Sequence, residues 1–274
     1  MSAMRKSTPI AIATALAAGS GILAYPLFFR RWCLTWGARP DEVASKLPGD
    51  ELLAEPGIVS TRAVWVDAPA SSIWPWLVQM GPGRGGAYTY DWIENLFGLG
   101  MHSAGEILPQ YQDLQVGDAQ RLGKRGPLLR VAVLEAERSL VLRSDDGHWV
   151  WAFSLVPEAV GTRLISRNRI ATPSAPLPVR LLNLLVMEPG SLVMERKMLL
   201  GIKQRAEALA RRAENSASVA KEGSRCHTLS TTRPRIVARM PRPRAISLSV
   251  SERSSRSSAG AAIGSARSGP ASPC

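Results

Sequence analysis

A phenol, a carboxylate and an imidazole lie close together in the sequence, at Tyr88, Asp91 and His102. Side chains of these three kinds can exchange protons with an enolisable substrate. The spacing does not by itself bring His102 next to Asp91, and a single histidine in a loop is usually a surface residue. The segment therefore supplies three candidate catalytic residues, with an ordinary surface loop as the alternative.

A fourth candidate, Glu195, lies on the apolar side of a predicted helix that begins at Ser191. A carboxylate facing an apolar interior is costly unless it is paired. The predicted strand 162–170 offers partners on one face, namely Arg163, Arg167 and Arg169, and Arg143 lies on a neighbouring strand. A Glu–Arg pair there would orient a polar ligand head or act as an acid/base pair. In the alternative, Pro189-Gly190 breaks the helix and Glu195 occupies a new first turn, where the helix dipole favours it.

Large aromatic side chains alternate along the predicted strand 148–156, which places Trp149, Trp151 and Phe153 on one face. Such a face can line a ligand cavity or simply pack as the core of a sheet. A second aromatic group lies on the predicted helix 88–97, where Tyr88 and Trp92 share a side. The predicted ligand-binding residues are therefore Trp149, Trp151, Phe153, Tyr88, Trp92, Arg167 and Glu195.

Metal chemistry has little support in the sequence. The three histidines stand apart, and the three cysteines, Cys33, Cys226 and Cys274, form no CxxC pair. A metal site at His102 would need carboxylates such as Asp91 or Glu94 to complete it. We therefore predict no metal site.

The order of predicted elements indicates an α+β domain. A strand at 58–66 is followed by a helix from Pro69 to Val78 and by the helix 88–97. Strands then follow at hairpin spacing, separated by turn residues of which Asp146-Gly147 is the strongest signal. These strands cover residues 119–122, 128–135, 140–143, 148–156 and 162–170. The long helix from Ser191 closes the domain.

Four stretches within this order, 67–69, 73–81, 85–96 and 193–203, carry a resemblance to a known superfamily. The chain resembles the helix-grip superfamily of START-like and polyketide cyclase-like proteins, also called SRPBCC, and within it bacterial members with a membrane anchor. The resemblance covers about residues 32–212. It implies a curved antiparallel sheet around a long C-terminal helix, with an apolar cavity between them. Superfamily members bind lipids, sterols, polyketides or hormones, and some are cyclases or hydrolases.

The glycines Gly81, Gly83 and Gly86 match the pattern G-x-G-x-x-G of nucleotide-binding loops. That pattern requires a strand before it and a helix after it, whereas here a helix precedes it. We therefore predict no nucleotide cofactor and expect a flexible loop at the mouth of the cavity.

The N-terminus predicts a membrane anchor. Residues 9–29 carry no charge and would span about 31 Å as a helix, which matches the hydrocarbon thickness of a bilayer. Arg30, Arg31 and Trp32 follow at the exit. A cleaved signal peptide is the alternative. We expect a single-pass protein of a bacterial inner membrane, and the basic residues at both ends give no orientation.

The net charge of +12 is concentrated at the C-terminus. Residues 215–274 hold ten of the 34 Lys and Arg residues, two of the 22 acidic residues and no aromatic residue. Too little apolar surface is present to offset the entropy of ordering, so we predict a disordered tail. Binding of nucleic acid by counterion release is an alternative that we do not favour. A further alternative is that the tail is not a selected sequence, because a GC-rich gene read out of frame gives the same composition.

The sequence thus predicts a membrane anchor at 1–31, a connector at 32–57, a START-like ligand-binding domain at 58–214 and a disordered tail at 215–274. The predicted function is binding of a hydrophobic or amphipathic small molecule, lipid-like or polyketide-like, in an internal cavity. The alternative is a cyclase or hydrolase acting on such a molecule.

Overall fold

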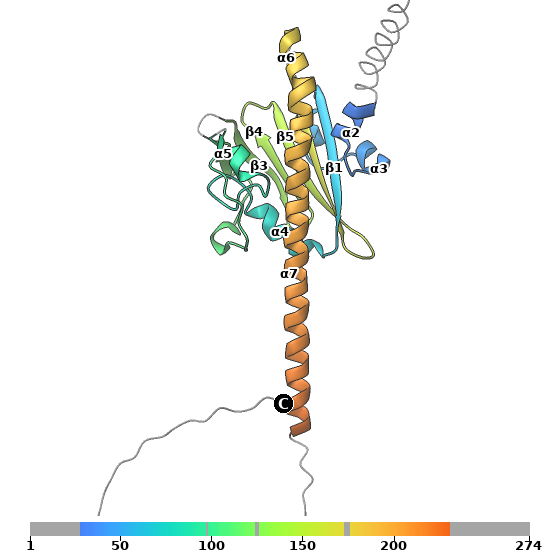
Figure 1. Cartoon of the computed structure of the whole chain (residues 1–274), viewed down its shortest axis with the longest axis vertical. Coiled ribbons are helices and arrows are strands. Elements are labelled where there is room, and N and C mark those ends of the chain that lie inside the picture. The colour runs from blue at the N-terminus through green and yellow to red at the C-terminus, as the bar shows by residue number, and fades with distance from the viewer. Residues whose placement is uncertain (1–27, 97, 124–125, 173–175, 231–274) are drawn as a thin grey trace, which may run out of the picture. The chain divides into compact units, whose positions relative to one another are not determined.

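A computed structural model describes residues 28–96, 98–123, 126–172 and 176–230 (Figure 1). The predicted membrane span 9–29 therefore lies outside the described residues except for its last two. The chain divides into a unit of residues 1–226 and a unit of residues 227–274. Most of the second unit, and most of the predicted tail, is likewise not described.

Six strands in the described residues form one antiparallel sheet in the order β1-β6-β5-β4-β3-β2. Helices α4 (Ala70–Val78) and α5 (Asp91–Leu96) come between β1 and β2, as the sequence predicts. The predicted α+β class, the antiparallel sheet and the order of elements along the chain are confirmed. The strands are β1 (Ile58–Val66), β2 (Ala119–Arg121), β3 (Leu128–Glu135), β4 (Ser139–Ser144), β5 (Trp149–Pro157) and β6 (Thr162–Ile170).

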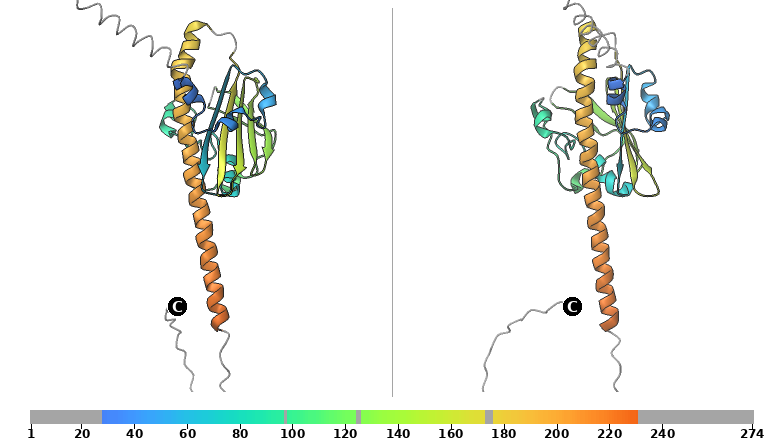
Figure 2. Two further views of the ribbon diagram at one scale, coloured as in Figure 1. Left: turned by 90° about the vertical axis from the view of Figure 1, so that its right-hand side faces the viewer. Right: turned by 45° about the vertical axis from the view of Figure 1, so that its right-hand side comes forward.

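The long helix α7 (Glu188–Ser230) crosses one face of this sheet (Figures 1 and 2). Met198, Leu199 and Ile202 are at most 1% exposed and belong to one core cluster with sheet residues such as Phe153 and Leu164. Burial of one such side chain contributes about 1.5–3 kcal/mol. The helix reaches Ser230, so residues 215–230 are helical and the predicted disorder does not begin at 215.

The proline at position 189 does not break the helix. The chain runs from α6 (Leu177–Leu182) through a π-helical turn, η4 (Asn183–Met187), directly into α7. A proline donates no backbone hydrogen bond and its ring clashes with the carbonyl four residues earlier, at Leu185. The wider turn at η4 provides the local distortion that this residue requires. The alternative interpretation, with Glu195 in a new first turn, is therefore wrong.

The segment predicted as a connector covers the other face of the sheet (Figure 2). Its α3 (Pro40–Ala44) and 3₁₀ turn η2 (Asp50–Leu53) lie on this face. The helix before them, α2 (Arg30–Leu34), lies against β1 and is bound to α7 through Arg30 and Glu188. Val150 and Ala152 of β5 pack beneath η2, because they point away from α7. Side chains alternate between the two faces along each strand, so one set packs toward α7 and the other packs toward α3 and η2.

One helix within the described residues, Leu177–Val219, is long and apolar enough to cross a membrane by length and composition, with a mean hydropathy of 1.3 in its most apolar stretch. Only 11% of that stretch is buried.

Candidate functional site

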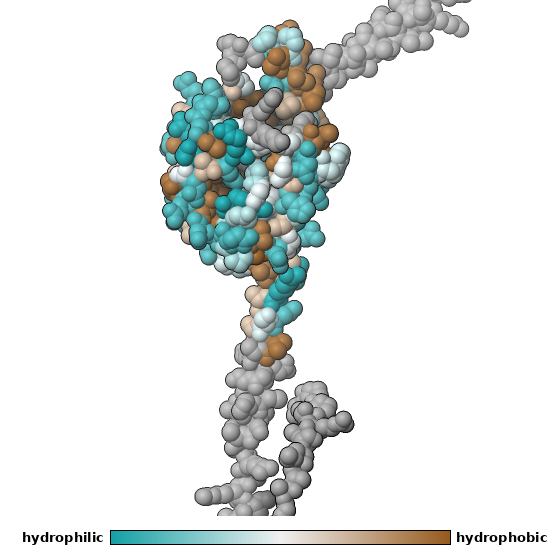
Figure 3. All heavy atoms as spheres, turned by 90° about the vertical axis from the view of Figure 1, so that its left-hand side faces the viewer, coloured by the Kyte–Doolittle hydropathy of each residue, from teal (hydrophilic) through white to brown (hydrophobic). Residues whose placement is uncertain are grey.

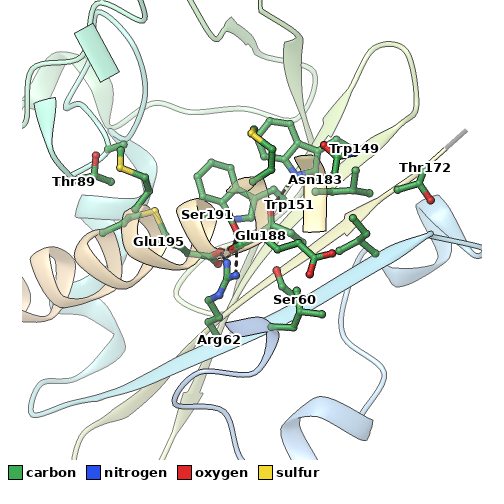
Figure 4. Close-up of a pocket in the computed structure, with 18 of the residues that line it drawn as sticks. Ser60, Arg62, Thr89, Trp149, Trp151, Thr172, Asn183, Glu188, Ser191 and Glu195 are labelled. Atoms are coloured by element: carbon green, nitrogen blue, oxygen red, sulfur yellow. Dashed lines mark hydrogen bonds and ion pairs between the residues drawn. The ribbon is translucent and has the colours of Figure 1, made fainter. Parts of the chain in front are cut away.

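A cavity of about 560 Å³ lies between the sheet and the helices α6, η4 and α7 (Figure 4). Strands β1, β5 and β6 form one wall, and the helices form the other. Its size is within the usual range for small-molecule pockets, roughly 300–1,000 Å³. The apolar lining includes Ile58, Trp149, Trp151, Ile170, Val179, Met187, Met194 and Met198.

The two tryptophans present flat apolar surfaces to the cavity. Their ring centroids are 5.6 Å apart and their planes differ by 16°. The indole Nε1 of Trp149 donates to Oδ1 of Asn168 at 2.8 Å, and that of Trp151 donates to Oγ of Ser166 at 3.0 Å. Because both N–H groups have partners within the sheet, the rings remain available for apolar contact with a ligand. The predicted alternation of β5 is confirmed, although Phe153 is fully buried and does not line the cavity.

A buried ion pair, Arg62–Glu195, forms the polar part of the cavity wall (Figure 4). Arg62 also donates from Nε to the carbonyl of Cys33 at 2.9 Å and from Nη2 to Oγ of Ser191 at 3.0 Å. Nδ2 of Asn168 lies 3.2 Å from both carboxylate oxygens of Glu195. Burial raises the pKa of Glu195, and the positive charge of Arg62 opposes that increase. Hydrogen bonds to Cys33, Ser191 and Asn168 thus hold the pair in place, and both of its residues line the cavity.

The arginines of β6 do not pair with Glu195 as predicted. Their side chains point to the face of the sheet opposite α7, which we call the outer face. Arg163 binds Glu42 of α3, with Nε and Oε1 2.8 Å apart. Arg167 donates to Oδ2 of Asp50 at 2.7 Å and to the backbone carbonyls of Ser45, Glu42 and Val43. Arg167 therefore does not reach the cavity, and its assignment as a ligand-binding residue is corrected. The three arginines share a face as predicted, but this face holds α3 and η2 against the sheet.

Glu94 and Thr89 form a second polar position in the cavity lining. Glu94 is 6% exposed, and its Oε2 atom is buried without a hydrogen-bond partner in the described protein. Oγ1 of Thr89 is likewise buried without a hydrogen-bond partner in the described protein. Burial raises the pKa of Glu94. The neighbouring hydroxyl of Thr89 lowers it, and the nearby charge of Asp91 adds to the increase. These two oxygen atoms lack protein partners at a place where a ligand hydroxyl or amine can supply them.

The remaining predicted catalytic residues do not line the cavity. Tyr88 is buried and donates its hydroxyl to the carbonyl of Trp76 at 2.9 Å, and burial raises its pKa to about 12. The carboxylate of Asp91 accepts hydrogen bonds from N and Oγ of Ser103, at 2.8 and 2.5 Å. His102 is exposed, and Trp92 is 70% exposed. The assignment of Tyr88 and Trp92 as ligand-binding residues is therefore wrong. Tyr88 is buried outside the cavity lining, and Trp92 of α5 points to the surface.

The glycine loop is a tight structural turn and not part of the cavity lining. Gly81 and Gly86 form a β-bridge, and a Cβ atom at Gly86, where φ is +71°, would lie 2.6 Å from the carbonyl oxygen of His102. The expected position at the cavity mouth is therefore corrected. Within the described residues, no group of three or more His, Cys, Asp or Glu side chains is placed to hold a metal ion.

Sequence reasoning did not select Arg62, Asn168 or Glu94 as cavity residues. A signal for Arg62 was present, because it shares a strand face with Val64 and Val66, which belong to the core. A charged residue on the apolar face of a strand indicates a buried partner. Asn168 and Glu94 carry no comparable signal, since their positions depend on the packing of α7 and of the loop before α5.

The long helix packed along an antiparallel sheet, with a cavity between them, decides the fold. The chain has a helix-grip fold. This is the fold implied by the resemblance to START-like and polyketide cyclase-like proteins, and that expectation is confirmed.

Comparison with known proteins finds similar solved structures at low sequence identity. No family model matches the chain, and no curated protein matches it. A polyketide cyclase-like protein from Corynebacterium glutamicum aligns with 58% of this chain and 93% of that chain, at 16% identity and a TM-score of 0.29. An AHSA1-like protein from Aeromonas hydrophila aligns with 55% and 93%, at 15% identity and a TM-score of 0.31. A protein from Mesorhizobium loti aligns with 55% and 98%, at 15% identity and a TM-score of 0.34.

Proposed function

We propose that the helix-grip domain binds a hydrophobic or amphipathic small molecule, lipid-like or polyketide-like, in the cavity between the sheet and α7. The observation that carries this proposal is the combination of an apolar wall, made by Trp149, Trp151 and three methionines, with a few convergent polar groups. Apolar contacts supply the affinity in such sites, while polar groups fix orientation.

The polar groups divide the cavity into two positions with different chemistry. At Arg62–Glu195 the charges are already paired, so a ligand group there adds hydrogen bonds without meeting an isolated charge. At Glu94 and Thr89 the oxygen atoms have no protein partner, so a hydroxyl or amine donor is favoured. The ligand that fits best has an apolar body and a polar group that donates hydrogen bonds.

We further propose that residues 9–29 cross a bilayer once and tether this domain to it, as the sequence predicts. An enzyme of the cyclase or hydrolase kind is the alternative function. Three carboxylates line the cavity, those of Glu94, Glu188 and Glu195. Both oxygen atoms of Glu188 are bound by Arg30, so such an enzyme would have to use Glu195 or Glu94.

Filling the cavity tests the binding proposal. Met194 lines the cavity from α7, whereas its neighbour Val193 is 53% exposed and does not. In Met194→Trp the added indole occupies ligand space, so we expect at least a tenfold loss of small molecules that copurify with the full chain. These molecules are released by denaturation after extensive detergent exchange and are counted per chain by mass spectrometry.

Val193→Trp is the matched control and is expected to retain wild-type occupancy. Circular dichroism of both variants establishes that the fold is intact. Equal occupancy in the two variants would contradict the proposal. So would an empty wild-type chain that also shows no thermal shift with fatty acids, lysophospholipids or aromatic polyketides.

A further inference from the structure

The helical segment before α7 exposes an apolar surface that no other described part of the chain covers. It consists of α6 and η4, and we call it the 177–187 segment. In Figure 1 it extends past the ends of the strands, and in Figure 3 this end of the molecule is coloured mostly as hydrophobic. Its exposed apolar residues are Leu177 67%, Val179 42%, Leu181 45%, Leu182 53%, Leu185 56%, Val186 55% and Met187 58%.

This surface is too short to cross a membrane. The 177–187 segment rises about 16 Å as a helix, whereas the hydrocarbon of a bilayer is about 30 Å thick. The helix is apolar for longer than this, but the residues that follow the segment are already engaged within the domain. Glu188 and Glu195 are buried in ion pairs with Arg30 and Arg62, and Leu192 is 4% exposed, so this part of the helix is not available to cross a bilayer. An apolar helix of this length lies on a membrane surface and does not span it.

The predicted membrane span ends beside this segment. Residues 9–29 lead directly into Arg30, whose Nε and Nη2 atoms bind the carboxylate of Glu188 at 2.8 and 2.9 Å. Glu188 is the first residue of α7 and follows the 177–187 segment directly. Phe28 and Trp32, on either side of Arg30, are 75% and 51% exposed. Where residues 9–29 leave a bilayer, the 177–187 segment must therefore be within reach of its surface.

Charge at this end of the molecule also suits a membrane. Arg31 and Arg180 are exposed basic residues, one on α2 and one on α6. Basic side chains next to exposed Trp and Leu residues are the composition of helices that lie in the interface of anionic bilayers.

We propose that the 177–187 segment, together with Phe28 and Trp32, docks on the surface of the anionic bilayer that holds residues 9–29. One consequence concerns the cavity. Val179, Asn183 and Met187 line it, and the exposure of Val179 and Met187 shows that the cavity reaches the surface here. Docking therefore places the helix that forms this wall of the cavity on the lipid surface, so an apolar ligand has only a short path around the segment between the bilayer and the cavity.

Residues on the docking face can be distinguished from those on the cavity face. The cavity residues Val179, Asn183 and Met187 recur every four positions, as one side of a helix does. Leu181 and Leu185 are two positions further on, about half a turn away, and do not line the cavity. A probe at Leu185 reports on docking without entering the ligand site.

The test uses the full chain in vesicles of phosphatidylcholine and phosphatidylglycerol. Cys226 and Cys274 are replaced by Ser, and Cys33 is retained because it is buried. Leu185→Cys is labelled with the fluorophore NBD, and Val160→Cys is the control. Val160 is 67% exposed in the turn between β5 and β6, at the opposite end of the sheet. Lipids that carry a nitroxide near the headgroup serve as quenchers.

We expect blue-shifted emission from the label at Leu185→Cys and at least threefold stronger quenching than at Val160→Cys. Equal quenching at the two sites overturns the proposal. A blue shift without quenching also overturns it, because residues 9–29 or a second copy of the chain then cover the segment. Adding Met194→Trp, which fills the cavity, is expected to leave the quenching unchanged, so failure of docking and failure of ligand binding are separate results.

Discussion

At the scale of single residues, the cavity wall contains carboxylates in two different electrostatic environments. Glu195 faces a buried guanidinium and an amide, which stabilise its charged form against the cost of burial. Glu94 has no cation bound to it, and one of its oxygen atoms has no partner. A buried carboxylate without a cation favours its protonated form, which can donate a hydrogen bond as well as accept one.

The pKa of both carboxylates is raised. Glu94, which has no bound cation, predicts a pH dependence of stability that a single substitution can test. Its pKa in the folded chain is raised above the ordinary 4.5, so the folded state binds this proton more tightly than the unfolded state. The contribution of Glu94 to stability is therefore complete below about pH 4.5 and is lost as the pH rises through the folded-state pKa. Glu94→Gln removes the titration, so at pH 7 this variant should be more stable than the wild type by on the order of 1 kcal/mol.

Urea unfolding followed by tryptophan fluorescence at pH 4 and pH 7 measures this effect. The stability difference between Glu94→Gln and the wild type is expected to grow from pH 4 to pH 7. Glu55→Gln, a change at an exposed position, is the control and should follow the wild type at both values. A difference that is the same at pH 4 and pH 7 would exclude this role for Glu94.

At the scale of elements, the hydrophobic pattern was sufficient to predict the strands of the sheet. It was not sufficient to predict which face of the sheet the charged residues occupy. Alternation in β5 and the turn at Asp146-Gly147 correctly predicted which residues of that strand face α7. The same alternation correctly placed the arginines of β6 on one face. It did not predict whether that face points toward α7 or away from it. That choice depends on α3 and η2, whose short, polar sequences gave no periodic signal and were predicted as a connector.

Arg167 is the residue on which this correction can be tested. It binds Asp50 and three carbonyls. Arg167→Leu therefore leaves the largely buried carboxylate of Asp50 with only Arg169, 3.4 Å away, and leaves several carbonyls without donors. We expect the free energy of unfolding to fall by about 3 kcal/mol. Occupancy of the cavity should stay at the wild-type value, because Arg167 lies on the outer face of the sheet.

Arg130→Leu provides the matched control for this experiment. Arg130 and Asp145 form an ion pair whose side chains are 47% and 44% exposed, and such pairs contribute about 0–1 kcal/mol. Urea unfolding and the ligand count are measured on both variants. If Arg167→Leu lost the ligand but kept the wild-type free energy of unfolding, Arg167 would have to be assigned to the binding site after all.

At the scale of the whole molecule, the proposed activity depends on how a membrane segment is joined to a ligand-binding domain. The sequence predicted the segment and the domain separately, from an uncharged stretch and from element order. It could not predict their connection, because Arg30 and Glu188 are 158 residues apart and carry no pattern that relates them. The connection matters, since it fixes Arg30, which directly follows the proposed span 9–29, beside Glu188 in the cavity lining.

Breaking this connection should therefore loosen α2 while leaving the sheet intact. The side chain of Glu188 is 7% exposed, so Arg30→Gln removes the cation from a buried carboxylate and weakens the attachment of α2 to α7. We expect backbone hydrogen exchange in Arg30–Leu34 to accelerate roughly tenfold for the full chain in lipid discs, which corresponds to about 1.4 kcal/mol, with no change in β5 or β6. Arg39→Gln is the control, because Arg39 pairs with Glu158 at an exposed site far along the chain from Glu188. If exchange in α2 is the same in Arg30→Gln, Arg39→Gln and the wild type, then the ion pair does not hold the membrane segment in place, and packing around Cys33 must do so instead.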